Sequence, residues 1–407
     1  MLKLNPYKQP MPVGVRLPEI EVDERHYKEL DITKDASNLE FLRKLCLRGV
    51  KKRGIDLLDN KDKYYDRVKM ELSVLDKLGF VEYILLNWDV LNYCHENEIP
   101  TGPGRGSAAG SLVLYLLKVT NVDPIKYDLF FERFVSESRA KKTIVDGVSY
   151  LDGSLLADID NDIAYDRRLE VIKYIERKHK GRTCKILTLN TLSSKLCIKE
   201  CGKIVGELSE DDVNSVGSHI PKKFGKLAKL EKAYEESEKF KQFADKNAKV
   251  FEIARKLEGL NKNSGVHPSG IAISFYNIEE VMPMQRTGDG DLISAYDMND
   301  VAALMVKFDI LGLRTLSVVH ETCKQLGIKI EDINVELPEI YENFRNIEAP
   351  KGLFQIEANT NFKVCKKISP RNLEELSAVV AIARPGALDY LDVYSEYINT
   401  GEFQSVN

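Results

Sequence analysis

Every second residue is an aspartate in the stretch Ala157-Asp158-Ile159-Asp160-Asn161-Asp162-Ile163. Side chains alternate between the two faces of a β-strand, so the three aspartates would share one face while Ile159 and Ile163 enter the core. Three neighbouring carboxylates repel one another unless solvent or bound cations neutralise them, and oxygen-only ligands favour hard cations such as Mg2+ over zinc. The stretch by itself leaves two interpretations open: a metal-binding strand for a reaction at phosphate, or an Asp-rich solvated loop.

The composition is that of an ordinary globular protein with room for two or three domains. Of the 407 residues, 43% are hydrophobic and 30% are charged. The sequence has no secretory pattern and no apolar run that could span a bilayer. Its seven cysteines are dispersed, which suits a reducing compartment. We therefore expect a cytoplasmic protein without membrane contact. Cys197 and Cys201 are interpreted as buried thiols rather than half of a zinc site. The net charge of -4 argues against a generic basic coat for nucleic acid but leaves room for separate basic patches.

Hydrophobic periodicity predicts helices that alternate with a few strands. Helices are expected over residues 38–53, 64–78 and 164–179, strands over 184–189, 271–274 and 304–313, and a turn over 265–270. His267 in that turn is expected to be a turn or core histidine. Residues 191–264 are predicted to be mostly helical and highly charged. Their lysines form either a solvated face or a surface that grips duplex DNA; these are Lys222, Lys223, Lys226 and Lys229.

A glycine-rich loop precedes the apolar residues 112–117 and reads Thr101-Gly102-Pro103-Gly104-Arg105-Gly106-Ser107-Ala108-Ala109-Gly110-Ser111. Such a turn, when it opens into a helix, exposes backbone N–H groups at the positive end of the helix dipole, which suits an anion. Arg105 can fork to phosphate oxygens, and Ser107 can donate a further hydrogen bond. The loop lacks the Gly-Lys-Ser/Thr of a Walker A motif. A phosphate cradle and a tight loop whose glycines serve packing are both open.

One acid and one base interrupt the apolar strand predicted at residues 304–313. In strand geometry Lys307 and Asp309 face the same way, and charged residues in an apolar strand are costly unless they are paired or coordinated. A structural Lys-Asp pair and a functional site are equally compatible with this pattern.

Together these segments resemble the catalytic core of the C family of replicative DNA polymerases, represented by the bacterial DNA polymerase III alpha subunit. Residues 102–107 are similar to the family's glycine-serine motif, and residues 129–134 (LFFERF) follow as they do in the family. The acidic stretch resembles the motif PDFDxDF, with Ala157 and Ile163 in place of Pro and Phe. Further similar segments occur in the family's order: residues 254–259, 307–313 (KFDxLGL), 354–357 and 383–386.

The resemblance implies an α+β fold with a nucleotidyltransferase-type palm, a mixed sheet with helices like that of X-family polymerases. It places a linker like the one after a PHP domain at residues 1–40, the palm at 41–191 and 265–313, an inserted α-helical thumb at 192–264 and the start of an α-helical fingers domain at 314–407. Residues 140–156 are expected to be an insertion that contains a hairpin.

The resemblance also implies the site. Asp160, Asp162 and Asp309 are the expected catalytic and metal-binding residues for two Mg2+ ions, and Asp158 is the weaker candidate. Arg105, Gly106, Ser107 and Lys307 are expected to bind the incoming nucleotide. The substrates would be primer-template DNA and dNTPs.

The family's remaining regions are expected on a second chain that completes the fingers and the C-terminal domains, as in a split polymerase of a bacterial or virus-infected bacterial cell. Three functions are compared: a template-directed DNA polymerase core, a catalytically incompetent fragment that binds primer-template, and a different metal-dependent nucleotidyltransferase. The last is disfavoured because the segments after the acidic stretch match the C family.

Overall fold

The computed structural model describes residues 14–137, 142–223, 226–384 and 386–402. The first thirteen residues of the expected linker, Arg139 and Ala140 at the start of the expected insertion, and Pro385 of the last similar segment lie outside this part. Two compact units are formed, Met1–Leu189 with Ser264–Leu326, and Asn190–Asn263 with Gly327–Asn407. A mixed sheet is combined with many helices, so the prediction of an α+β protein is confirmed.

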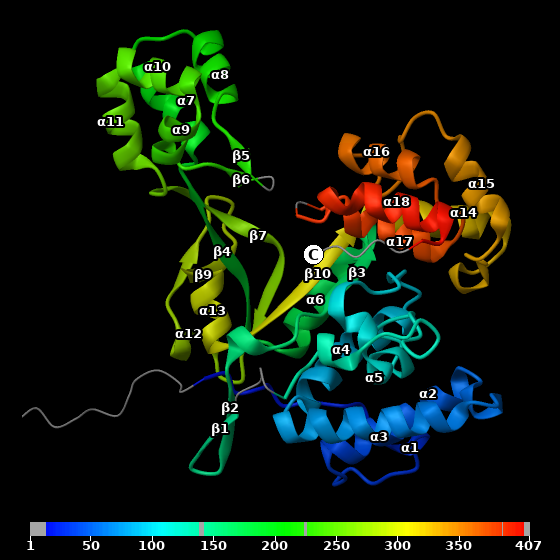
Figure 1. Cartoon of the computed structure of the whole chain (residues 1–407). Coiled ribbons are helices and arrows are strands. Elements are labelled where there is room, and N and C mark those ends of the chain that lie inside the picture. Colours follow the sequence, from blue (N-terminus) through cyan, green and yellow to red (C-terminus); the bar gives the residue numbers. More distant parts are fainter. Residues whose placement is uncertain (1–13, 138–141, 224–225, 385, 403–407) are drawn as a thin grey trace, which may run out of the picture. The chain divides into compact units, whose positions relative to one another are not determined.

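Helices dominate the first part of the first unit (Figure 1). The helices predicted at 38–53 and 64–78 are confirmed as α2 and α3. Ser37 begins α2, because its side chain accepts a hydrogen bond from the backbone N–H of Glu40. The elements are α1 (Glu24–Glu29), α2 (Asn38–Lys52), η1 (Ile55–Leu57), α3 (Lys61–Leu78), α4 (Val81–Glu96), η2 (Gly106–Gly110), α5 (Leu112–Leu116) and η3 (Phe131–Arg133).

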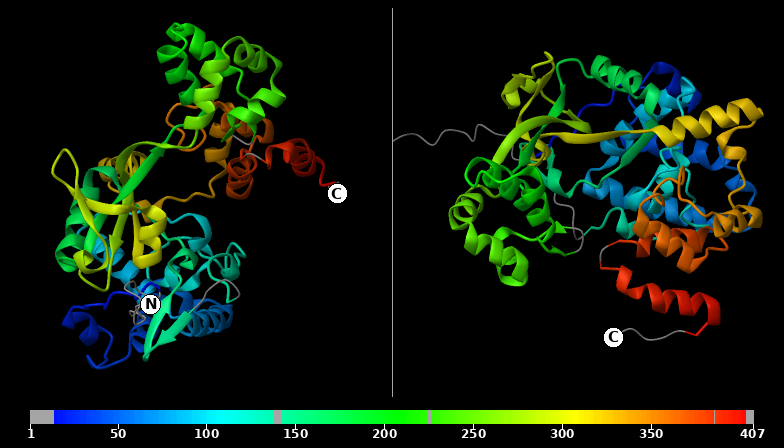
Figure 2. Two further views of the ribbon diagram at one scale, coloured as in Figure 1. Left: turned by 90° about the vertical axis from the view of Figure 1, so that its left-hand side faces the viewer. Right: turned by 90° about the horizontal axis from the view of Figure 1, so that it is seen from above.

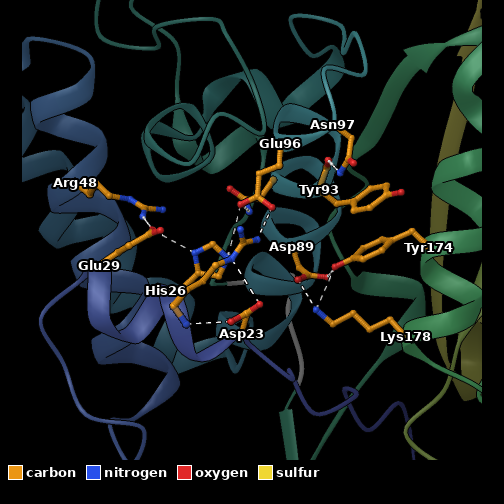
Figure 3. A network of polar contacts seen from close by, with 12 residues as sticks. Asp23, His26, Glu29, Arg48, Asp89, Tyr93, Glu96, Asn97, Tyr174 and Lys178 are labelled. Atoms are coloured by element: carbon orange, nitrogen blue, oxygen red, sulfur yellow. Dashed lines mark hydrogen bonds and ion pairs between the residues drawn. The ribbon is translucent and has the colours of Figure 1, made fainter.

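Helix α4 was not predicted, because most of its faces are buried and it lacks an amphipathic period. It is also tied to α6 (Arg168–Lys178) by polar side chains (Figure 3). The rings of Tyr93 and Tyr174 stack with centroids 3.9 Å apart, and Asp89 accepts hydrogen bonds from Tyr174 and Lys178. On another side, His26 of α1 packs edge-on against Trp88. Helix α4 is therefore fixed by side-chain contacts to both α1 and α6.

The main sheet has six strands among the described residues, in the order β3-β10-β7-β4-β9-β8. Strands β3 and β10 are parallel neighbours, with Asp160 opposite Asp309, and they run side by side in Figure 1. The helix predicted at 164–179 is confirmed as α6. The strands of the sheet are β3 (Asp160–Ala164), β4 (Thr183–Thr191), β7 (Asn261–Ile273), β8 (Met284–Arg286), β9 (Leu292–Asp297) and β10 (Val306–Leu313). The helices that accompany them are η4 (Gly153–Leu155), η5 (Tyr165–Arg167), α12 (Ile278–Val281), α13 (Met298–Leu304) and α14 (Arg314–Leu326).

The turn predicted over residues 265–270 is wrong, because β7 runs through it. Glycine and proline indicate a turn locally, but β7 pairs with β10, where Gly270 lies opposite Asp309. The ring Nδ1 of His267 accepts a hydrogen bond of 2.7 Å from the Gly270 N–H, so the histidine is a structural residue of this strand. Burial lowers the pKa of this histidine. A Cβ atom on Gly270 would lie 2.9 Å from that nitrogen, which explains the glycine.

A hairpin forms within the expected insertion. Strands β1 (Lys142–Val145) and β2 (Val148–Leu151) pair antiparallel, and the hairpin predicted at residues 140–156 is confirmed for the described residues. Its base is attached to the chain before α1, because Leu151 and the buried Val15 exchange backbone hydrogen bonds of 2.8 Å.

The second unit is mainly helical, as predicted for residues 191–264. Helices α7–α11 lie between β4 and β7 in the sequence and form a compact group in both views of Figure 2. Leu192 and Leu260 join the two ends of this segment by a backbone hydrogen bond of 2.9 Å, and Cys197 and Cys201 are buried thiols. The elements are α7 (Ser194–Ile204), α8 (Glu210–Ser218), β5 (Lys222–Lys223), β6 (Lys226–Leu227), α9 (Leu230–Glu236), α10 (Glu238–Lys246), α11 (Ala248–Leu257), η6 (Ile330–Asp332), α15 (Pro338–Asn346), α16 (Asn359–Ile368), α17 (Leu373–Ile382), η7 (Leu388–Tyr390) and α18 (Leu391–Thr400).

Across the described ranges, none of the helices combines the length and apolar character needed to cross a membrane.

Candidate active site

Three carboxylates meet at the edge of the main sheet. The parallel register of β3 and β10 sets Asp160 opposite Asp309, and Asp158 lies just before β3. One carboxylate oxygen from each of these residues lies within 4.8 Å of the other two. Asp309 is buried, Asp160 is half-buried and Asp158 is exposed, so the group is open to solvent on one side. We call these three residues the acidic cluster.

Asp162 lies on the same strand but has a different partner. Its carboxylate accepts a hydrogen bond of 2.6 Å from Nη2 of Arg105, and Nε of the same arginine lies 3.6 Å from the Asp160 carboxylate. Of the predicted metal ligands, the structure therefore brings Asp160 and Asp309 together, with Asp158 as the third member. The part that Asp162 plays in metal binding stays a prediction.

The carboxylates of this strand are held in an unfavourable environment. Although Asp158 is exposed to solvent on one side, desolvation of its carboxyl by the surrounding residues raises its pKa, and the negative charge of Asp160 adds to the rise. Burial also raises the pKa of Asp160 and of Asp162, while the Arg105 guanidinium opposes both rises. The charged forms are thus only partly compensated by the protein's own cations, and a bound cation would complete the compensation.

Lys307 and Asp309 face the same way, as predicted, and form an ion pair of 2.7 Å through Oδ2 of the aspartate. The other oxygen, Oδ1, is buried and has no hydrogen-bond partner among the described residues. A buried carboxylate oxygen is rarely left unpaired, since its desolvation is costly. An oxygen-only donor set with an unpaired buried oxygen fits a hard divalent cation such as Mg2+.

The glycine-rich loop is attached directly to the acidic strand. The N–H of Gly102 donates a 2.8 Å hydrogen bond to the carbonyl of Asp162, and a Cβ atom on Gly102 would lie 2.7 Å from the Asp162 Cβ. Gly106 has a φ of 64° and nothing within 4 Å of its Cβ position. One glycine therefore permits close approach to the strand, and the other leaves open space beside Arg105 and Ser107.

The first turn of α5 is not available to an external anion. The N–H groups of Leu112 and Val113 donate hydrogen bonds of 2.9 and 3.0 Å to the buried carboxylate of Glu71, which also accepts from the Ser111 hydroxyl. Arg67 completes the arrangement, because it donates to Glu71 at 2.7 Å and to the carbonyl of Gly110. A phosphate at this loop would therefore contact the upstream residues Arg105, Gly106 and Ser107.

Ser107 lines a cavity of 290 Å³ together with residues before the expected insertion, at its end and directly after it, among them Arg133, Leu156 and Ala157. This cavity lies beside the start of the acidic stretch, since Ala157 directly precedes Asp158. Of the loop residues predicted to bind nucleotide, Ser107 thus borders a cavity next to the start of the acidic stretch.

Sequence reasoning missed the residues that support the site from behind. Glu71 and Arg67 have the i, i+4 spacing of an ordinary helix-surface ion pair, so nothing local marks them as partners of the loop. The Lys-rich segment at residues 222–229 forms the short strands β5 and β6 in its described part, and its contact with DNA stays a prediction.

Comparison with known proteins agrees with this geometry. Residues 40–312 match the model of the bacterial DNA polymerase III alpha NTPase domain, and residues 314–405 match that of the alpha subunit finger domain. DNA polymerase III subunit alpha of Staphylococcus aureus (strain NCTC 8325 / PS 47) is 32% identical over 387 residues, which cover 92% of this chain and 34% of the relative. The subunit of Bacillus subtilis (strain 168) is 32% identical over 366 residues, 87% of this chain and 31% of the relative.

The chain therefore spans about a third of the length of the curated relatives that it matches. Both family models fall in sequence order, and the first alone covers more than half of the chain. The chain belongs to the family of bacterial DNA polymerase III alpha subunits.

Proposed function

We propose that the acidic cluster is the catalytic centre of a template-directed DNA polymerase, which transfers deoxynucleotides from dNTPs to a primer 3′-hydroxyl by a two-metal mechanism. The observation that carries the proposal is the register of β3 and β10, which gathers the carboxylates of Asp158, Asp160 and Asp309 within 4.8 Å. Family membership supplies the reaction class. The unpaired oxygen of Asp309 and the raised pKa values of its neighbours support cation binding.

Each charged residue has a role in this proposal. Asp160 and Asp309 would hold both Mg2+ ions, with Asp158 or Asp162 as the third ligand. When bound, the ions supply Lewis-acid activation of the 3′-hydroxyl and charge stabilisation of the leaving pyrophosphate. Arg105 would exchange the carboxylate of Asp162 for a triphosphate oxygen, and Gly106 and Ser107 would contact the same phosphates. Lys307 would stabilise negative charge that develops on the transferred phosphate.

The domain assignment follows as part of the proposal. The nucleotidyltransferase-type palm would comprise residues 41–191 and 265–313, with residues 1–40 as a linker. Helices α7–α11 (192–264) would form the thumb, and residues 314–407 would begin the fingers. The thumb limits lie close to the unit boundaries at Asn190 and Ser264, whereas α14 groups with the first unit.

Primer extension with Mg2+ and all four dNTPs tests the proposal. The relatives are about three times as long, so the assay uses this chain alone and together with a chain that carries the remaining polymerase regions. We expect template-dependent extension in at least one case and none with the Asp160→Ala, Asp162→Ala double variant. Tight primer-template binding without extension in both cases would instead support the incompetent, DNA-binding fragment.

The third ligand is decided by a matched pair of variants. Asp158→Asn and Asp162→Asn each remove one negative charge from the same face of the acidic stretch. The variant that loses extension while keeping primer-template affinity identifies the ligand, and equal activity of both with the unchanged protein would contradict the assignment of either residue.

A further inference from the structure

Three polar side chains are buried between α4 and the acidic strand, on the side away from the carboxylates. They are Tyr83 and Asn87 of α4 and Asn161 of β3, with exposed fractions of 4%, 0% and 2%. None of them belongs to the acidic cluster or to the glycine-rich loop. Their role is therefore not explained by the proposed chemistry.

These side chains make a continuous set of contacts with the acidic stretch. The Tyr83 hydroxyl donates a 2.8 Å hydrogen bond to the carbonyl of Ala157. The Asn161 amide donates to Oδ1 of Asn87 at 3.1 Å and to the carbonyl of Ile159 at 3.3 Å. Asn87 in turn donates to the carbonyl of Tyr83 at 2.9 Å, within α4. The acidic stretch is thus attached to α4 at two points, directly at the Ala157 carbonyl and through the Asn161 side chain, which also holds the Ile159 carbonyl.

The anchored positions alternate with the charged ones. Ile159 and Asn161 are buried towards the core, while Asp158 and Asp160 project the other way, as the period of an extended chain requires. The carboxylates repel one another, and the stretch before Asp160 is not part of β3, so the sheet alone does not hold Asp158. Attachment to α4 supplies the missing support, because α4 is itself fixed to α6 (Figure 3).

A buried amide pair is an unusual choice where stability alone is needed. Replacing both partners of a buried hydrogen bond by apolar groups of similar shape is often nearly neutral for stability, whereas removal of one partner leaves the other unsatisfied. An aliphatic pair at positions 87 and 161 would remove the buried amides together, but it would not fix the orientation of the strand by hydrogen bonds, and the Ile159 carbonyl would lose the Asn161 donor.

We propose that Tyr83, Asn87 and Asn161 are positioning residues, which hold the backbone of the acidic stretch so that the carboxylates of Asp158 and Asp160 meet that of Asp309. The inference rests on the proposed function, because positioning has a purpose only if the cluster binds cations. Groups that orient metal ligands from behind typically change metal affinity by about 10–100-fold when they are removed.

The test is a titration with Mn2+, followed by electron paramagnetic resonance, on the full chain without substrate. Mn2+ accepts the same oxygen ligands as Mg2+. The Asn87→Leu, Asn161→Leu double variant removes both partners of the amide pair together and should lower the melting temperature by only about 2–4 °C, mainly because the Ile159 carbonyl loses the Asn161 donor. Its affinity for Mn2+ should fall roughly tenfold, while primer-template affinity stays within about twofold because no positioning residue contacts DNA in the proposal. Unchanged Mn2+ affinity in a folded double variant would overturn the inference.

A milder matched pair keeps the test valid if the double variant does not fold. Tyr83→Phe and Tyr64→Phe each remove one hydroxyl from a buried tyrosine, and Tyr64 donates its 2.8 Å hydrogen bond to Asp123, which is not part of the acidic stretch. Only Tyr83→Phe should weaken Mn2+ binding, and equal affinities of the two variants would also overturn the inference. Failure of the proposed function gives a different result, in which Asp160→Asn leaves the Mn2+ affinity of the otherwise unchanged protein intact.

Discussion

Replacing Asp160 by asparagine should make the metal-free protein more stable while removing its response to divalent cations. Asp160 shares the edge of the sheet with Asp158 and Asp309, and burial raises its pKa despite the opposing charge of Arg105. A raised carboxyl pKa means that the charged form is disfavoured in the folded protein. An uncharged amide of the same shape removes this penalty.

The size of the effect follows from the distances. Two unit charges 4.8 Å apart repel by about 3.5 kcal/mol at an effective dielectric constant of 20. Asp160 has two such neighbours, and Nε of Arg105 at 3.6 Å offsets roughly one of them. Because 31% of the Asp160 side chain is exposed, solvent screens most of the remainder. We expect a gain of about 1 kcal/mol in the free energy of unfolding, which raises the melting temperature by about 2–4 °C for a unit of this size.

Calorimetry in EDTA and then in excess Mn2+ measures both parts of the prediction. The unchanged protein should melt at a higher temperature with Mn2+, because a ligand that binds only the folded state stabilises it. Asp160→Asn should start higher in EDTA and gain little from Mn2+. Asp289→Asn, at an exposed loop position, is the control and should leave both temperatures unchanged. A lower melting temperature of Asp160→Asn in EDTA would refute the account of repulsion in the acidic cluster.

Two other predictions address the loop and the pH dependence. Glu71→Gln leaves Arg67 without its buried charge partner, so it should lower the free energy of unfolding, measured by urea denaturation, by roughly 3 kcal/mol or more. The control is Glu137→Gln, which breaks an exposed ion pair with Lys77 and should lower it by less than about 0.5 kcal/mol. Equal losses in the two variants would contradict the role of Glu71. The pKa of Asp158 is raised from its ordinary value of 3.8 in the folded protein. Between 3.8 and the raised pKa, the folded state still binds a proton that the unfolded state has released. The free energy of unfolding in EDTA should therefore fall as the pH rises through this range. Asp158→Asn should flatten that slope, and an unchanged slope would show that other groups cause it.

The acidic stretch was predictable because its signal is local. Aspartates alternate with Ile159, Asn161 and Ile163, and this period of two separates the two faces of an extended chain. The same holds for α2, α3 and α6, whose apolar residues recur with the helical period. Helix α4 lacked this signal because it is buried on most sides, and with it the contacts of Tyr83 and Asn87 were missed.

The sequence could not show which aspartates form the acidic cluster, because this depends on contacts between segments that lie far apart in the chain. Four aspartates carry identical side chains, and which three of them meet is set by the register of β3 against β10 and by the position of Arg105 on another loop. The strand β7 shows the same limitation, because Gly265 to Gly270 has the residues of a turn but lies within a strand whose end, from Gly270 on, pairs with β10.

The glycine-rich loop shows how a distant residue can divide a motif between two functions. Its sequence suited either a phosphate cradle or a packing loop, and the structure contains features of both. Glu71, forty residues before Ser111, already accepts the free N–H groups of α5, so the downstream half of the loop serves packing. The upstream half keeps the open space at Gly106 beside Arg105, which pairs with the acidic strand. A triphosphate bound here would therefore compete with Asp162 for the same guanidinium, and nucleotide binding and metal binding at this edge of the sheet would be coupled through Arg105.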